Sequence, residues 1–260
     1  MSAERFGAKL ARTSNQLRKG EVTPGELLER HYERVRRAAY RAFGRDYYSG
    51  LRIYRALVLE RIGTVYGGWV IPVRRFGRDS ICYSVGVGED ISFDEGMMDR
   101  FGCEVHAFDP TPRAIQFVER HGGTLPRFHF HPYGLWHEDA VLKFFAPADP
   151  THVSHSILNL QKTDHYFEAP CRRLREVMKE YGHARLDLLK LDIEGAEYKV
   201  LESLIEDRLD VGVICVEYDE IGHPLDREYR GRLRGSLERL LAYGYRLAAV
   251  EFATYTLVKD

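Results

Sequence analysis

Short apolar runs alternate with amphipathic segments along most of this chain. Four runs have the length and bounds of buried strands, and they occupy 81–85, 103–109, 186–193 and 211–217. Helical spacing of apolar residues follows each of them, as in the segment with Val200, Leu201, Leu204 and Ile205 on one face. This alternation predicts an α/β fold with a mainly parallel sheet.

Further elements follow from the same patterns. Helices are predicted to begin near Ser92 and after Gly195, and to occupy about 112–119, 172–181 and 227–241. Phe128–His131 alternates as a third strand, and 133–136 then leads to a hairpin return over 141–145. The last two runs, 245–252 and 254–258, are joined so tightly that they must be antiparallel.

The first 62 residues carry helix signals, and we expect a helical extension over 1–62 before a main domain over 63–260. Thr23 and Pro24 form a typical helix start. The basic cluster Arg34–Arg37 follows several glutamates at helical spacing. It therefore reads as a solvated helix face rather than a nucleic-acid site.

Charge and composition narrow the possible partners and location. The 260 residues include 38 basic and 39 acidic ones, so the net charge of -1 favours neither a nucleic-acid nor a membrane surface. The 4 cysteines are widely spaced and read as core residues in a reducing compartment. With neither a membrane span nor a signal peptide in its sequence, the chain is expected to be cytoplasmic. Its oligomeric state is left open.

The stretch Ile81–Asp90 is typical of a strand, a tight turn and a helix start. Gly86, Val87 and Gly88 form the turn, where bare peptide can approach a ligand. Asp109 ends the next strand 21 positions after Gly88, where a carboxylate can accept hydrogen bonds from a ribose. We also assign Leu135, beyond the third strand, to the cofactor site.

The residues after the glycines indicate which nucleotide the turn would bind. A dinucleotide fingerprint needs a third small residue, but Ile91 stands at that position, and Glu89 and Asp90 lie in the turn. Two carboxylates repel a pyrophosphate and attract a sulfonium and an ammonium. The turn therefore favours S-adenosylmethionine over NAD, with an ordinary glycine-containing turn as the plain alternative.

Acids also follow the later strands. Asp192 with Glu194, and Glu217, end two further strands, so they should face one cleft together with Gly86 and Asp109. Each acid has a structural alternative: Asp192 or Glu194 can cap a helix, and a buried Lys190 needs a carboxylate partner.

Histidines suggest a metal site without defining one. His129 and His131 share a strand face, and His137, His152, His155 and His165 follow. Their spacing matches no established zinc motif, so we predict no structural zinc. A divalent cation held by the strand-end acids is possible but not favoured.

Several of these motifs together resemble the FkbM-type S-adenosylmethionine-dependent methyltransferases. The blocks are 68–69, 83–94, 101–110, 155–156 and 188–197, and the likeness extends over about 67–220. The resemblance implies a class I methyltransferase fold, with a seven-stranded, mostly parallel sheet and one antiparallel strand near its end. It assigns Gly86 and Gly88 to the cofactor loop, Asp109 to the ribose, and Asp192 and Glu194 to the methyl-transfer site.

We expect an S-adenosylmethionine-dependent O-methyltransferase that acts on a hydroxyl of a sugar or secondary metabolite. Removal of the hydroxyl proton requires a base, for which the candidates are His155, Asp192, Glu194 and Glu217. Residues 1–62 lie outside the resemblance and are candidates to shape the acceptor pocket. Two rivals stay open: an NAD-dependent oxidoreductase, and a non-catalytic cofactor-binding module that acts through a partner protein.

Overall fold

The computed structural model describes residues 24–123, 125–148, 155–159 and 161–259. The chain divides into two compact units, Met1–Gly50 and Leu51–Asp260. In the first unit, helix α2 occupies Pro24–Ala42. The predicted cap Thr23, and His152 of the histidines considered for a metal site, lie outside the described residues.

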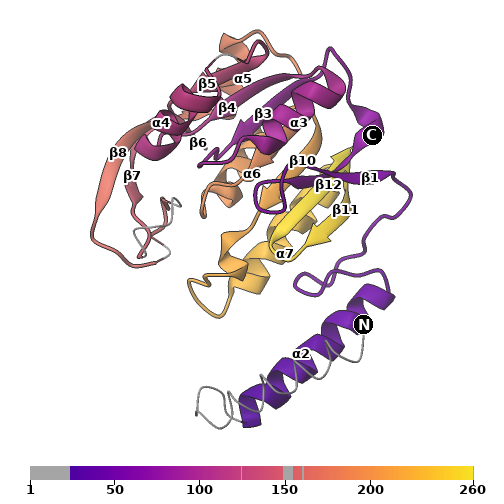
Figure 1. The fold of residues 1–260 in the computed structure, drawn as a ribbon. Coiled ribbons are helices and arrows are strands. Elements are labelled where there is room, and N and C mark those ends of the chain that lie inside the picture. Colours follow the sequence, from indigo (N-terminus) through magenta and orange to yellow (C-terminus); the bar gives the residue numbers. More distant parts are fainter. Residues whose placement is uncertain (1–23, 124, 149–154, 160, 260) are drawn as a thin grey trace, which may run out of the picture. The chain divides into compact units, whose positions relative to one another are not determined.

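The second unit is built on a seven-stranded sheet with the order β11-β12-β10-β9-β3-β4-β5 (Figure 1). Strands β10, β9, β3, β4 and β5 are parallel, whereas β12 is antiparallel to both β10 and β11. This arrangement confirms the predicted class I methyltransferase fold. In chain order the strands are β3 (Ile81–Val85), β4 (Glu104–Phe108), β5 (Phe128–His131), β9 (Leu186–Leu191), β10 (Val211–Glu217), β11 (Tyr245–Glu251) and β12 (Thr254–Lys259).

Helices cover both faces of this sheet. On one face, buried side chains of α3 and α4, including Met97 and Val118, pack with Val105 and Ala107 of β4. On the other face, α6 contacts both α5 and α7 (Figure 1). The helices are α3 (Ser92–Phe101), α4 (Pro112–His121), α5 (Leu174–Glu180), α6 (Glu197–Glu206) and α7 (Tyr229–Ala242).

A short hairpin precedes the main sheet. Strands β1 (Leu59–Ile62) and β2 (Trp69–Pro72) pair antiparallel. The end of the segment predicted as helical is therefore a strand, because Leu59 and Ile62 pack with the sheet core instead of with a helical neighbour. Trp69 is buried in the same core.

A second sheet corrects one prediction. Strands β6 (Gly134–Trp136) and β7 (Ala140–Phe145) do not pair as a hairpin, because β8 (Tyr166–Arg173) lies between them. Helix α5 consequently begins at Leu174 and not at Arg172, which belongs to β8. Arg173 links this sheet to the end of α6, since its Nε lies 2.7 Å from Oδ2 of Asp207.

The cysteines agree with a further prediction. All four cysteines are free and buried, which confirms their reading as core residues. Within the described part of the chain, no helix combines the length and apolar character that a membrane crossing requires.

Candidate functional site

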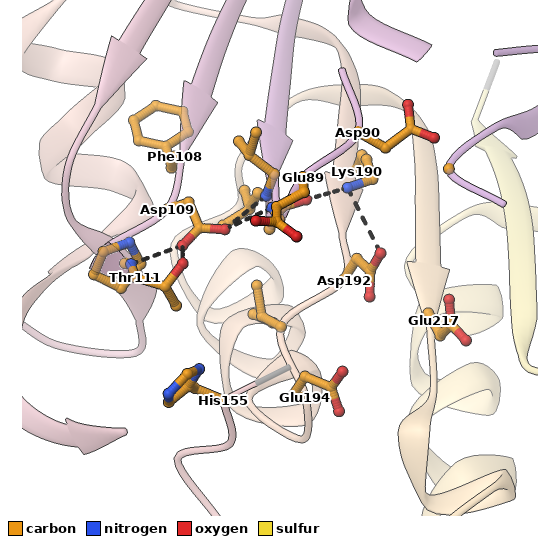
Figure 2. A pocket seen from close by; sticks show the side chains of 18 of the residues that line it. Glu89, Asp90, Phe108, Asp109, Thr111, His155, Lys190, Asp192, Glu194 and Glu217 are labelled. Atoms are coloured by element: carbon orange, nitrogen blue, oxygen red, sulfur yellow. Dashed lines mark hydrogen bonds and ion pairs between the residues drawn. The ribbon is translucent and has the colours of Figure 1, made fainter. Parts of the chain in front are cut away.

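A cavity of about 410 Å³ opens where β3, β4, β9 and β10 end. This is the edge of the sheet at which ligands bind in open α/β folds. Asp192, Glu194 and Glu217 project around the same space in Figure 2. The cavity brings together every residue that the sequence proposes for the site: Gly86, Val87, Gly88, Glu89, Asp90, Asp109, Leu135, His155, Asp192, Glu194 and Glu217.

The turn after β3 depends on its glycines. Gly86 has φ +84° and Gly88 has φ +57°, a left-handed backbone that other residues rarely adopt. A Cβ on Gly86 would lie 1.8 Å from the carbonyl oxygen of Asp192. The Gly86 carbonyl in turn accepts a hydrogen bond from Nζ of Lys190. The turn and the end of β9 therefore fit together as one rigid floor of the cavity.

Asp109 is occupied by contacts within the protein (Figure 2). Its Oδ2 accepts hydrogen bonds from the backbone N–H groups of Val87 and Gly88, at 2.9 and 3.0 Å. Its Oδ1 accepts from the backbone N–H and the hydroxyl of Thr111, at 2.8 and 2.6 Å. A carboxylate accepts about four such bonds. In this arrangement Asp109 braces the glycine turn, a role that the sequence does not predict.

The two carboxylates in the turn are also paired. Glu89 faces Arg113 of α4, whose Nη2 lies 2.8 Å from Oε2. Asp90 accepts from the Thr64 hydroxyl at 2.7 Å and from the Ser92 N–H at 2.8 Å. Burial alone would raise the pKa of Asp90, but these hydrogen bonds lower it. Because Arg113 offsets the charge of Glu89, the repulsion expected against a pyrophosphate is weaker than the sequence implies.

Lys190 and Asp192 form the centre of the cavity. Lys190 is buried within β9, and its Nζ lies 3.7 Å from Oδ2 of Asp192. This pair confirms the prediction that a buried Lys190 needs a carboxylate partner. Burial nevertheless raises the pKa of Asp192, and the Lys190 charge opposes that rise. Lys190 is not among the site residues predicted from the sequence, although a charged residue inside an apolar strand is a signal that could have indicated it.

The other strand-end acids lie close to this pair. Burial, followed by the charges of Asp192 and Glu194, raises the pKa of Glu217 to about 8. Glu194 has φ +52°, an uncommon backbone for a residue with a side chain. Its carbonyl accepts a hydrogen bond of 2.6 Å from the Ser156 hydroxyl. This conformation is of the kind that folds retain at functional sites.

A second cavity, of about 230 Å³, adjoins the first. Glu194, Glu217 and Asp219 line both cavities, so these three acids lie at their boundary. Burial and the neighbouring Glu197 raise the pKa of Asp219. Asp219 lies two residues after Glu217, the last residue of β10, so it is beyond the strand-end position that marks Glu217 as a candidate. The other lining residues of the second cavity are Gln161, Gly222, His223, Phe252 and Ala253.

His155 lines the first cavity and comes from the segment beside β7; it is drawn next to Glu194 in Figure 2. Its ring meets that of Phe167 edge to face, with the centroids 5.2 Å apart. Tyr66 and Thr111, which also line the cavity, carry no signal in the sequence that separates them from ordinary surface residues. Among the described residues, the cavity acids form no group of three ligand atoms within 4.8 Å of one another.

Several known proteins similar to this chain are named as methyltransferases or as methyltransferase-like. The family model "Methyltransferase FkbM domain" matches residues 78–247. The "Probable methyltransferase-like protein 24" of Rattus norvegicus is 34% identical over 137 residues, which are 52% of this chain and 31% of that protein. The human protein of the same name is 33% identical over the same length. The chain thus spans about a third of the length of these curated relatives.

Solved structures with related architecture include two bacterial methyltransferases. Methyltransferase FkbM from Methylobacillus flagellatus KT is 13% identical, with a TM-score of 0.43 over 70% of this chain and 44% of its own. Precorrin-6y C5,15-methyltransferase from Geobacter metallireducens GS-15 is also 13% identical, with a TM-score of 0.40 over 71% of this chain and 84% of its own.

Proposed function

Since the chain belongs to the FkbM methyltransferase family, we propose that it transfers a methyl group from S-adenosylmethionine to a hydroxyl oxygen of a small molecule. The observation that carries this proposal is the cavity itself, in which a bare glycine turn faces an excess of carboxylates. The volume of about 410 Å³ is in the range of small-molecule and cofactor sites.

The charges that line the cavity suit a cationic ligand. Lys190 is the one lysine or arginine among the described lining side chains, and it is already paired with Asp192. The acidic lining residues are Glu89, Asp90, Asp109, Asp192, Glu194, Glu217 and Asp219. A sulfonium and an ammonium would be attracted to those carboxylates of the rim that are ionised, whereas a pyrophosphate would be repelled by them.

The chain's own residues would bind and orient the cofactor. The Gly86 and Gly88 backbone lets a ligand lie directly against the turn, and Asp109 holds the turn in shape through Val87 and Gly88. When bound, S-adenosylmethionine supplies an activated methyl group to a nucleophile placed in line with its carbon–sulfur bond. The protein's main task is therefore positioning.

We assign the removal of the acceptor's proton to Glu217. Its pKa of about 8 lies near the working pH, which is the condition for an effective general base. Glu217 also lies at the boundary between the two cavities, where the acceptor would meet the methyl group. In this assignment Asp192, Glu194 and His155 surround the reacting groups, and the ion pair with Lys190 holds Asp192 in place.

The second cavity is the proposed acceptor site. Gln161, His223 and Asp219 offer donors and acceptors around it, which suits a hydroxyl-rich acceptor such as a sugar or a polar natural product. Phe252 and Ala253 supply an apolar side against which a ring can pack.

Thermal denaturation with S-adenosylmethionine, S-adenosylhomocysteine or NAD tests the cofactor assignment. We expect stabilisation by both sulfur compounds at concentrations above their Kd and none by NAD, because a ligand stabilises only the state that binds it. Stabilisation by NAD alone would reject the proposal.

Turnover is tested by following S-adenosylhomocysteine release across sugars, polyketides and phenols. Tight cofactor binding with no turnover on any acceptor would favour the non-catalytic module. We expect Asp109→Ala to weaken cofactor binding more than Asp192→Ala does, because Asp109 holds two N–H groups of the turn. Equal effects would contradict the assigned roles.

A further inference from the structure

A cluster of histidines lies on the sheet face beside α5, away from the cavity. The parallel register of β4 and β5 places His106 opposite His129 and Phe108 opposite His131. Glu104 begins β4 two residues before His106, so its side chain points to the same face. None of Glu104, His106 and His129 lines either cavity described above.

Three potential ligand atoms converge at this point. Oε1 of Glu104 lies 3.2 Å from Nε2 of His129 and 3.4 Å from Nε2 of His106. All three atoms lie within 4.8 Å of one another, the one such group among the described residues. A tetrahedral zinc ion with bonds of about 2.0–2.1 Å separates its ligand atoms by roughly 3.3–3.4 Å. Two of the three separations already match this value.

The orientation of His106 gives an independent indication of a ligand. Its side chain is only 5% exposed, yet among the described residues no atom forms a hydrogen bond with its Nε2, although Oε1 of Glu104 lies 3.4 Å away. An unsatisfied buried polar atom is costly, and it needs an explanation such as a bound ion. Glu104 and His129, by contrast, are 35% and 44% exposed, so water can reach the same point.

The other nitrogen of His106 is already held. Its Nδ1 lies 3.1 Å from Nε2 of His131, and Nδ1 of His131 lies 3.1 Å from the Tyr181 hydroxyl. Histidines that bind metals usually make such a hydrogen bond through the second ring nitrogen, which fixes the orientation of the ring. The supporting contacts of a metal ligand are thus present on the buried side.

We propose that Glu104, His106 and His129 bind a divalent transition-metal ion, with zinc as the best match. Two imidazoles and a carboxylate are a known ligand set for zinc, and solvent water can complete the tetrahedron. The ion would fasten the edge strand β5 to β4. Sequence patterns alone predict no structural zinc, whereas the proposed site would bind it. The proposed ligands lie on two adjacent strands, so no compact sequence motif marks them.

Zinc titration of the metal-free full chain by calorimetry tests the site. We expect the wild-type chain to bind one zinc ion. His129→Ala and Glu104→Gln should each lower the affinity for zinc by about tenfold or more, because each removes a ligand. Both side chains are substantially exposed, so the variants should fold, which circular dichroism would check. His121→Ala is the matched control, since His121 is exposed on α4 and outside the group.

A second readout does not depend on heat of binding. Cobalt in place of zinc should give the visible absorption of a tetrahedral ion in the wild-type chain and in His121→Ala, and lose it in His129→Ala. The proposal fails if the wild-type chain binds no stoichiometric ion, or if His129→Ala and Glu104→Gln bind zinc as tightly as the wild type.

Discussion

Gly86 shows how one missing side chain shapes the candidate site. Its backbone is left-handed, and the Asp192 carbonyl occupies the position that a Cβ would need. Gly182 has a similar φ, +74°, but no atom lies within 4 Å of its would-be Cβ. A comparison of substitutions at Gly86 and Gly182 therefore distinguishes the cost of backbone strain, which both share, from the cost of a steric clash, which only Gly86 has.

Gly182→Ala should cost about 1–2 kcal/mol, the usual penalty for a left-handed residue with a side chain. Gly86→Ala should cost more, because the clash forces the turn away from β9, and it should also abolish S-adenosylhomocysteine binding. Melting temperatures and calorimetric titrations of both variants provide the measurement. If both variants lost similar amounts of stability and both still bound S-adenosylhomocysteine, the close contact between residue 86 and the Asp192 carbonyl would be contradicted.

Glu217 should give the reaction its pH dependence. With a pKa of about 8, its carboxyl is mostly protonated at pH 7, so turnover should rise as the pH increases through about 8. Glu217→Gln cannot accept the proton and should lose most of this activity and the rise itself, a loss of about 10²–10⁴-fold for a general base. A pH–rate profile that is unchanged in the variant would rule out this role.

The same residue should affect stability in a defined direction. Its folded-state pKa of about 8 exceeds the ordinary 4.5, so the fold favours the neutral form and loses stability as the pH rises between these values. Glu217→Gln should therefore melt at a higher temperature than the wild type at pH 8, with a smaller difference at pH 5. The exposed Glu138→Gln serves as the control, with no such trend expected.

Residue type and position at strand ends predict which side chains reach the cavity, but not what each one contacts. Asp109 could be placed from the sequence, whereas its bonds to Val87 and Thr111 depend on how the turn folds back. Arg113 lies 24 positions from Glu89, so their ion pair arises only from the packing of α4 against the turn.

At the scale of elements, α7 offers a direct test of helix propensity. Gly231 and Gly235 lie inside this helix, and no atom lies within 4 Å of the position of an added Cβ at either residue. Gly231→Ala and Gly235→Ala should each stabilise the fold by roughly 0.5–1 kcal/mol, because alanine loses less entropy in a helix. That gain corresponds to about 1–4 °C in melting temperature. A lower melting temperature of either variant would contradict the open space for a Cβ at that position.

Elements with strong periodicity could be predicted, and those that depend on distant partners could not. The parallel strands and α3, α4 and α6 carry continuous apolar patterns, so their positions agree with the sequence. Strand β8 contains Glu168, Pro170 and two arginines, a composition that local patterns do not read as a strand. It is stabilised by pairing with β6 and β7 on its two sides.

At the scale of the whole molecule, every described residue that lines the two cavities belongs to Leu51–Asp260. A fragment with residues 51–260 should therefore fold and bind S-adenosylhomocysteine within about twofold of the full chain. Calorimetry on both proteins measures this. The sequence makes residues 1–62 candidates to shape the acceptor pocket; if residues 1–50 have that role, the fragment would keep cofactor binding and lose turnover. Loss of cofactor binding would contradict the assignment of the cavity to the second unit.

The overall topology was accessible from the sequence for a physical reason. Parallel strands buried on both faces leave long apolar runs, and the tight connection between β11 and β12 allows only an antiparallel pair. The acceptor was not accessible, because its proposed cavity is lined by loop residues such as Gln161 and His223, whose neighbours are set by the tertiary structure.

The interlock between the glycine turn and β9 also limits how the protein can diverge. The Asp192 backbone carbonyl fills the space beside Gly86, so a side chain at position 86 would collide with backbone that no substitution at position 192 removes. Lys190 binds the Gly86 carbonyl and holds the two segments together. Among descendants of this chain, residue 86 should therefore remain glycine, whereas the half-exposed pair of Arg113 and Glu89 can change more freely.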